Sequence, residues 1–234
     1  MLDFIAIGLG AALLIPMSLF VASTATYVGR VRLLAKYKHA FDRGDIQEVM
    51  RLRELVRAGL PESELTRESE KVGEGEVLLL HERWADARDI LAKVDRSMLP
   101  LKSRPGVLSN LAYATAQAGE PEAAIDLVRL ALDEAEAQGS SYPAEKPPFL
   151  KSTLGVSLGL AGRHEEAVSW LEPLIGIDHP KRAQTTRAYY LAMSYRALGR
   201  FKDAAHTFAI AAKGDGPFAD RARLAGARLH PHRS

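Results

Sequence analysis

A short pattern built around a turn glycine occurs three times and constrains the fold more than any other feature of the sequence. In each copy a leucine and a small residue precede the glycine, a small residue stands five positions after it, and a large apolar residue follows four positions later. The copies align on Gly119, Gly162 and Gly199, with Leu111-Ala112, Leu154-Gly155 and Leu191-Ala192 before them and Ala124/Val128, Ala167/Leu171 and Ala204/Phe208 after them. Self-similarity at such a period indicates stacked supersecondary units.

Each copy predicts two short antiparallel helices joined by the glycine turn. Small residues let two helices approach closely, and large apolar residues fill the space beside the crossing. The clearest copy covers residues 108–131 and turns at residues 118–121. A weaker copy lies upstream and has Gly75, Leu78, Trp84, Ala87, Leu91 and Val94. We therefore expect an all-α chain, an α-solenoid of helical hairpins in which Trp84 is a packing residue.

The pattern resembles the tetratricopeptide repeat (TPR), which reads W-x2-L-G-x2-Y, then A-x3-F, then P. The best copy has Leu191-Ala192, Tyr195, Ala204, Phe208, Ala211 and Pro217, and the next best has Leu154-Gly155, Leu158, Ala167, Leu171 and Pro180. Thr115 departs from the family tyrosine, Leu174 departs from its final alanine, and the period exceeds the usual 34 residues. The resemblance covers roughly residues 69–217 and implies a protein-binding solenoid.

Breaks in the pattern divide the chain into eight segments. We expect a transmembrane anchor at 1–29, an amphipathic extension and degenerate first hairpin at 30–60, TPR-like repeats at 61–100, 101–138, 149–180 and 181–216, a loop insertion at 139–148, and a capping helix and tail at 217–234. The insertion is polar and explains why Ala124 and Ala167 are farther apart than the other repeat alanines. Such a loop is either merely tolerated or contacts a partner.

The N-terminal segment 4–29 has no charged side chain and is mostly apolar. It exceeds the roughly 20 residues that a helix needs to cross the hydrocarbon core of a bilayer. We interpret it as a transmembrane helix. The alternative is a cleaved signal peptide, but that class has a basic start, whereas this chain begins Met1-Leu2-Asp3.

Basic residues after this segment predict its orientation. Arg30, Arg32, Lys36 and Lys38 follow it, and no basic residue precedes it. Because such residues stay on the cytoplasmic side, we expect the rest of the chain to face the cytoplasm as the soluble part of a single-pass protein, most readily of a bacterial inner membrane. The same charges are placed to contact anionic headgroups.

The sequence carries no recognised catalytic motif. A Walker loop, a nucleotide-binding glycine fingerprint, G-x-S-x-G and HExxH are all missing, and cysteine is absent. The turns 81–83 and 164–166 contain histidine and glutamate, but we interpret them as solvent-exposed helix starts. We predict no enzyme activity, no catalytic residue, no cofactor and no metal, and the net charge of +2 gives no reason to expect nucleic acid.

Binding is what a stacked array of hairpins does, because the array curves into an extended concave surface. In the family that this chain resembles, the first helix of each hairpin lines that surface. The corresponding positions here are Ser109, Tyr113, Gln117, Ser152, Val156, Leu160, Tyr189, Met193 and Arg196. This mixed groove suits a peptide or helix segment. The set with which some relatives clamp a C-terminal carboxylate is missing, since its positions hold Gly106, Asn110, Ser152 and Thr153.

Three functions remain open from the sequence. The first is a membrane-anchored scaffold that binds a protein partner at the cytoplasmic face, in assembly of a membrane or envelope complex. The second keeps the fold but reverses the topology, giving an extracytoplasmic chaperone or assembly factor. The third is an enzyme with an unrecognised site. The sequence names no partner besides the bilayer, and nothing in it supports a homo-oligomer.

Overall fold

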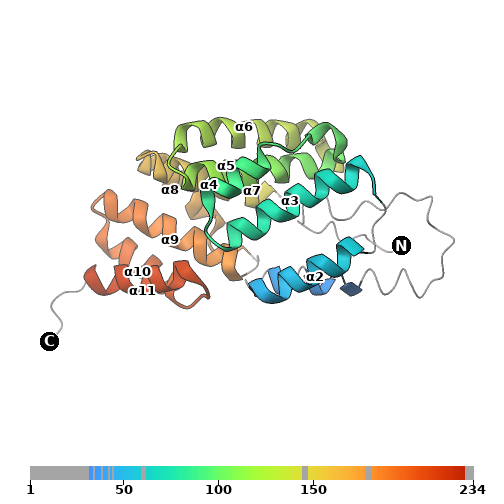
Figure 1. The fold of residues 1–234 in the computed structure, drawn as a ribbon. Helices are drawn as coiled ribbons and strands as arrows, with labels where there is room; N and C mark the ends of the chain where they lie inside the picture. Colours follow the sequence, from blue (N-terminus) through green and yellow to red (C-terminus); the bar gives the residue numbers. More distant parts are fainter. Residues whose placement is uncertain are drawn as a thin grey trace.

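The fold is all-helical in the part of the chain that the structure describes (Figure 1). This structure, a computed structural model, describes residues 32–33, 35–37, 39–41, 43, 45–58, 62–143, 147–177 and 181–229. The expected transmembrane segment, residues 4–29, lies outside these ranges. Among the helices inside them, none combines the length and the apolar character needed to cross a bilayer.

The helices follow one another in antiparallel pairs. They are α2 (Ile46–Ala58), α3 (Glu64–Leu80), α4 (Trp84–Leu91), α5 (Arg104–Gln117), α6 (Pro121–Ala137), α7 (Pro147–Leu160), α8 (His164–Leu171), α9 (Lys181–Ala197), α10 (Phe201–Ala212) and α11 (Pro217–Leu229). Helix α3 pairs with α4, α5 with α6, α7 with α8 and α9 with α10. Each pair also packs on the next, through α4 on α5, α6 on α7 and α8 on α9, and α11 covers α9 and α10. This is a TPR-like solenoid, which confirms the expected fold class for the helical array.

Close helix crossings explain the small residues of the repeat. A Cβ atom added to Gly155 would lie 2.6 Å from Cγ of Leu171, and one added to Gly75 would lie 2.5 Å from Cγ of Leu91. Ala167 and the three equivalent alanines are fully buried. Each hairpin therefore joins a small residue on one helix to a large one on the other, as the pattern predicts.

The turn between the two helices of a hairpin needs a left-handed backbone. The φ angles are +99° at Gly119, +79° at Gly162 and +72° at Gly199. The hairpin of α3 and α4 has Glu82 at the equivalent place, with a φ of +58°. Among the described residues, Glu82 is the one non-glycine residue with positive φ. Its backbone is strained, because a side chain disfavours this region.

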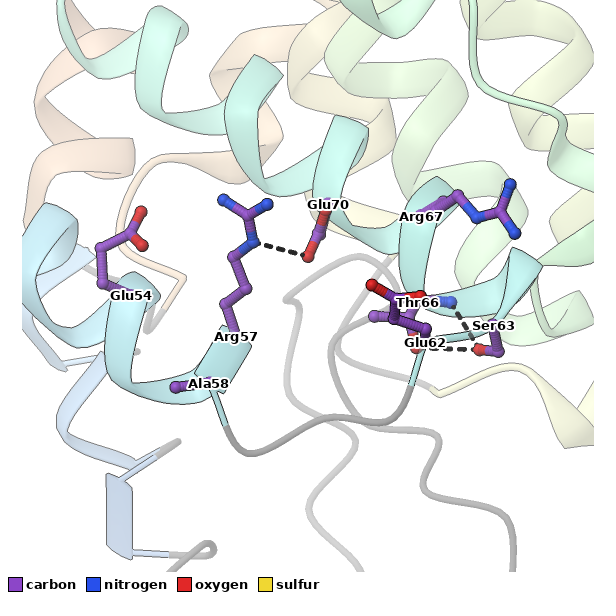
Figure 2. Close-up of a pocket in the computed structure, with 8 residues that line it drawn as sticks. All are labelled: Glu54, Arg57, Ala58, Glu62, Ser63, Thr66, Arg67 and Glu70. Atoms are coloured by element: carbon purple, nitrogen blue, oxygen red, sulfur yellow. Dashed lines mark hydrogen bonds and ion pairs between the residues drawn. The ribbon is translucent and has the colours of Figure 1, made fainter.

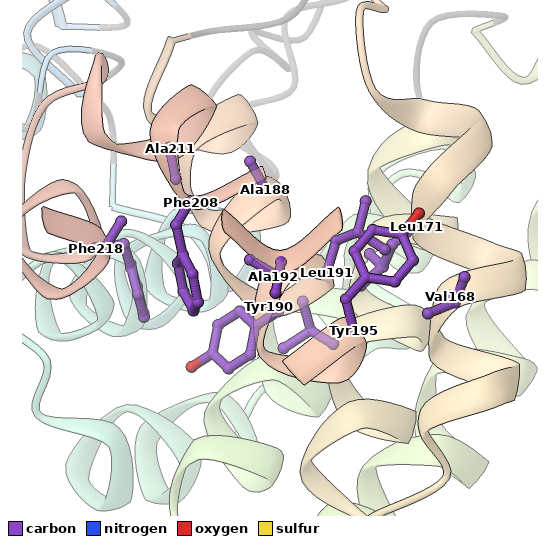
Figure 3. Close-up of a cluster of buried hydrophobic side chains, with 13 residues drawn as sticks. Val168, Leu171, Ala188, Tyr190, Leu191, Ala192, Tyr195, Phe208, Ala211 and Phe218 are labelled. Carbon is purple, nitrogen blue, oxygen red and sulfur yellow. The ribbon is translucent and has the colours of Figure 1, made fainter. Parts of the chain in front are cut away.

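The largest buried cluster lies at the C-terminal end (Figure 3). Tyr190, Tyr195 and Phe208 fill the space between α9 and α10, and Phe218 of α11 packs on the same side chains. Leu171 joins the cluster from α8. Helix α11 thus seals an apolar face that would otherwise meet water, as expected of a capping helix.

The N-terminal part of the array has two features of its own. Every described residue from 32 to 43 is helical, and Tyr37 and Ala40 pack against α2 and α3. Helix α3 begins at Glu64, inside the expected repeat 61–100, because the hydroxyl of Ser63 caps it by accepting a hydrogen bond from the Thr66 N–H at 3.1 Å.

The polar insertion at 139–148 is tied to the core through one aromatic residue. Gly139–Ser141 forms a short 3-10 turn, after which Tyr142 is buried against Leu108, Ala131 and Leu150. This part of the insertion therefore packs as a wedge between the hairpins α5–α6 and α7–α8. Residues 144–146 lie outside the described ranges.

Candidate functional site on the concave face

The structure separates the nine residues that the sequence places on the concave face. Ser109 and Val156 are fully buried, and the Ser109 hydroxyl donates to Thr153 Oγ1 at 2.8 Å, so these two join one repeat to the next. Leu160 is exposed. The remaining six are half-buried: Tyr113, Gln117, Ser152, Tyr189, Met193 and Arg196. Only Leu160 and the half-buried residues are therefore placed to meet a partner.

Two of these residues contact side chains of other helices. The Gln117 side-chain amide donates to the Tyr190 hydroxyl at 2.6 Å, which links α5 to α9 past the intervening hairpin. The Tyr113 ring packs edge-on against Trp84 of the neighbouring helix α4, with ring centroids 5.7 Å apart. Both side chains are therefore engaged within the chain itself. Trp84 is a packing residue here, in agreement with the interpretation from the sequence.

An ion pair joins the capping helix α11 to the turn between α3 and α4. Arg221 Nη2 of α11 lies 2.8 Å from Glu82 Oε2, in the turn between α3 and α4. The Arg221 guanidinium also lies over the Phe218 ring, 4.8 Å from its centroid. Phe218 in turn packs on Tyr189 and Tyr190, at 5.3 Å from each. The arginine is therefore held in place by an aromatic stack before it meets the glutamate.

We call these side chains together the concave cluster. It consists of Glu82, Trp84, Tyr113, Gln117, Arg182, Tyr190, Phe218 and Arg221. They come from α3–α4, α5, α9 and α11, so the curvature of the array is what brings them together.

Burial dominates the electrostatics of the concave cluster. It raises the pKa of Tyr113 well above the usual value, with a further increase from Tyr190. It also raises the pKa of Tyr190 to about 12, although the hydrogen bond from Gln117 acts in the opposite direction. Desolvation lowers the pKa of Arg182, and Tyr113 and Glu82 partly offset that effect. Both phenols are consequently neutral at physiological pH.

The charges of the concave cluster are not fully paired. Within the described residues, the Arg182 guanidinium lies within 4.0 Å of no carboxylate, although the Glu82 charge acts on it from farther away. On the other side, Glu82 Oε1 is buried and has no hydrogen-bond partner in the described part of the chain. Two guanidinium groups thus act on one carboxylate that binds only one of them directly.

The charged half of this cluster was not predicted from the sequence. The expectation that Glu82 is solvent-exposed is wrong: the Glu82 side chain is only 25% exposed and is paired with Arg221. Arg182, Tyr190 and Arg221 were not among the predicted residues. One signal was present in the sequence, because Glu82 stands where the other repeats have glycine. A turn that needs positive φ rarely keeps a side chain without a reason.

A hollow lies between α2 and α3, away from the concave cluster (Figure 2). It has a volume of about 530 Å³ and is lined by Glu54, Arg57, Ala58, Glu62, Ser63, Thr66, Arg67 and Glu70. Its charges have both signs, and Arg57 Nε already lies 3.1 Å from Glu70 Oε1. Ser63 is engaged as the cap of α3. Nothing in this lining converges on one point, as a catalytic site requires.

Comparisons with known proteins found similarity to solved structures and to no family or curated protein. No protein-family model matches the sequence, and no curated protein matches it. Among solved structures, the chain is similar to the nearly identical TPR-like repeats of a candidate kinesin light chain from Podosopora anserina, at 20% sequence identity and a TM-score of 0.47, over 88% of this chain and 99% of that chain. A single-residue variant of that protein is similar at 20% identity and a TM-score of 0.48, over 87% and 98%. The description of this chain as a TPR-like solenoid rests on its own helix contacts and turns.

Proposed function

We propose that this chain is a scaffold that binds a protein partner through its helical array. One observation supports this above the others: aromatic and charged side chains from several hairpins gather on one side of the array, and Trp84, Tyr113 and Arg221 among them are only half-buried. Tyrosine, tryptophan and arginine are the residue types that dominate binding energy at protein interfaces. The fold itself is typical of interaction modules.

We further propose that residues 4–29 anchor this scaffold in a membrane, with the array on the cytoplasmic side. The support is the charge-free run followed by basic residues. Arg32 and Lys36 are exposed on the first described helix. An assembly role at a bacterial inner membrane fits this layout. A reporter fused after Ser234 tests the topology, since activity only outside the cytoplasm would favour the extracytoplasmic chaperone instead.

Partner capture from membranes tests the binding proposal. Full-length protein, crosslinked in membranes and then purified, should retain a specific partner. Leu160→Asp should reduce the captured amount about tenfold, because it places a charge on the exposed apolar part of the concave face. Leu130→Asp is a matched control, since Leu130 is 42% exposed against 39% for Leu160 but lies on α6, a second helix of its hairpin. Equal capture by both variants would move the binding surface away from the concave face.

A further inference from the structure

We propose that Glu82 and Arg221 form a clasp that holds the concave cluster closed, so that a partner reaches its side chains only after the two residues separate. The inference rests on the proposed binding function for its biological meaning, but the clasp itself is a property of the chain alone. It joins the turn of the hairpin α3–α4 to the capping helix α11, 139 residues later in the sequence.

The backbone of Glu82 is strained, whereas the equivalent turns avoid strain by using glycine. Glycine occupies this turn position in the three following hairpins, where it adopts positive φ without strain. Glu82 adopts the same region at a φ of +58° despite its side chain. A strained residue persists where the surrounding structure holds it in place. Here the backbone hydrogen bonds of the turn do so, from the Glu82 N–H to the Leu79 carbonyl and from the Arg83 N–H to the Leu78 carbonyl, and the side chain that the turn carries pairs with Arg221.

The Arg221 side chain is held in position by its own aromatic contacts. Its guanidinium is stacked on Phe218, and Phe218 is itself buried against the tyrosines of α9. Because the aromatic stack limits the rotamers of the arginine, little further ordering is needed when Glu82 arrives. Arg182 lies close enough to feel the Glu82 charge. The carboxylate therefore enters a region that is positive on two sides.

The clasp is also built to open. The side chains are 41% exposed at Arg221 and 25% exposed at Glu82, so water and salt reach the ion pair. Partly exposed pairs of this kind are weak. Beneath the clasp lie the hydrogen bond from Gln117 to Tyr190 and the packing of Tyr113 against the C-terminal cluster. A small rearrangement of the superhelix would separate α11 from the turn at Glu82 without breaking any hairpin.

A distance measurement tests the clasp without any partner. The natural chain has no cysteine, so Ala85→Cys and Ala227→Cys place a unique pair of spin labels on two exposed positions, one in α4 and one in α11. Pulsed electron paramagnetic resonance on the full-length protein in nanodiscs should give one narrow distance distribution. Glu82→Gln and Arg221→Gln should each broaden the distribution and shift it to longer distances. High salt should do the same to the spin-labelled chain that keeps both Glu82 and Arg221. Arg223→Gln is the matched control, an exposed arginine on α11 whose ion-pair partner within the described part of the chain is Asp220.

Two further variants separate the loss of the ion pair from a failure to fold. The charge exchange Glu82→Lys with Arg221→Glu should restore the narrow distribution, because it rebuilds the pair with reversed polarity. If Glu82→Gln fails to fold, Glu82→Gly removes the carboxylate while relaxing the turn, and it should broaden the distribution equally. An unchanged distribution in every single variant would overturn the clasp. This outcome is distinct from a failure of the proposed function, which would appear as an absent partner while the distances still respond.

Partner capture provides the second readout. Glu82→Gly and Arg221→Gln should each capture several-fold more of the crosslinked partner than the natural chain. Lower capture by both variants, together with broadened distances, would show that the pair belongs to the binding surface and does not exclude the partner.

Discussion

Glu82 carries two opposed contributions to stability in a single residue. The left-handed backbone costs about 1–2 kcal/mol for a residue with a side chain. A partly exposed ion pair stabilises the folded state by only about 0.2–1 kcal/mol. The residue is therefore a poor choice for stability alone, which is what is expected at positions kept for function.

Replacing Glu82 by glycine should accordingly cost the fold little. Glu82→Gly removes the backbone strain and the ion pair together, so we expect the free energy of unfolding to stay within about 1 kcal/mol of the natural value. Glu82→Ala keeps the strain and loses the pair, so it should be the less stable of the two. Urea unfolding followed by circular dichroism measures both. The interpretation of the turn fails if alanine proves more stable than glycine there.

Tyr190 should make the fold sensitive to alkaline pH. Its pKa is raised from 10.0 to about 12 by burial, so between these values the unfolded chain loses the phenol proton while the folded chain keeps it. Folding stability is then fully present below pH 10 and falls as pH rises toward 12. A shift of this size corresponds to on the order of 2–3 kcal/mol. Unfolding of the natural chain and of Tyr190→Phe between pH 9 and 12 checks this: the variant should lose less stability across the interval.

At the scale of the helix pair, the fold depends on alanines that leave no room for a larger side chain. Ala204 is fully buried where α10 crosses α9, beside Phe208 and Tyr195. This arrangement follows from the repeat pattern, which is why the hairpins could be predicted from sequence. The repeat pattern reflects contacts between residues that are close in sequence, because both helices of a hairpin lie within one repeat.

Overfilling such a crossing should destabilise the fold. Ala204→Trp is expected to lower the free energy of unfolding by about 1–3 kcal/mol or more, because the helices must separate to admit the ring. Thermal unfolding of the full-length protein measures the change. Ala205→Trp is the control, since Ala205 is the next residue of α10 and is only half-buried. Equal effects of both substitutions would contradict the register of the hairpin.

The insertion behaves differently from its composition. Its polar residues predict a loop with no packing role, yet Tyr142 is buried under it. Tyr142→Ala should lower the free energy of unfolding by about 3 kcal/mol, within the range for losing a buried aromatic ring. Denaturation of this variant beside Ser140→Ala, an exposed neighbour, measures the contribution. The sequence offered little warning of this contact, because one aromatic residue among polar ones has no periodicity.

At the scale of the whole molecule, a solenoid normally has contacts only between neighbouring repeats. The hydrogen bond from Gln117 to Tyr190 and the ion pair from Glu82 to Arg221 exceed that limit. The helices and their order were predictable, but these contacts were not. They depend on the accumulated rotation from one hairpin to the next, and no single segment of sequence encodes that sum. The candidate residues Tyr113 and Gln117 were identified from position alone, and their partners became visible only in three dimensions.

The closure has a consequence for how such an array can change in size. Open solenoids tolerate the gain or loss of a unit, since each added hairpin only extends the spiral. In this chain, inserting one more hairpin between Glu82 and Arg221 would carry the arginine onward by a full step of the superhelix and away from the glutamate. The ion pair therefore fixes the number of hairpins that can stand between the two residues.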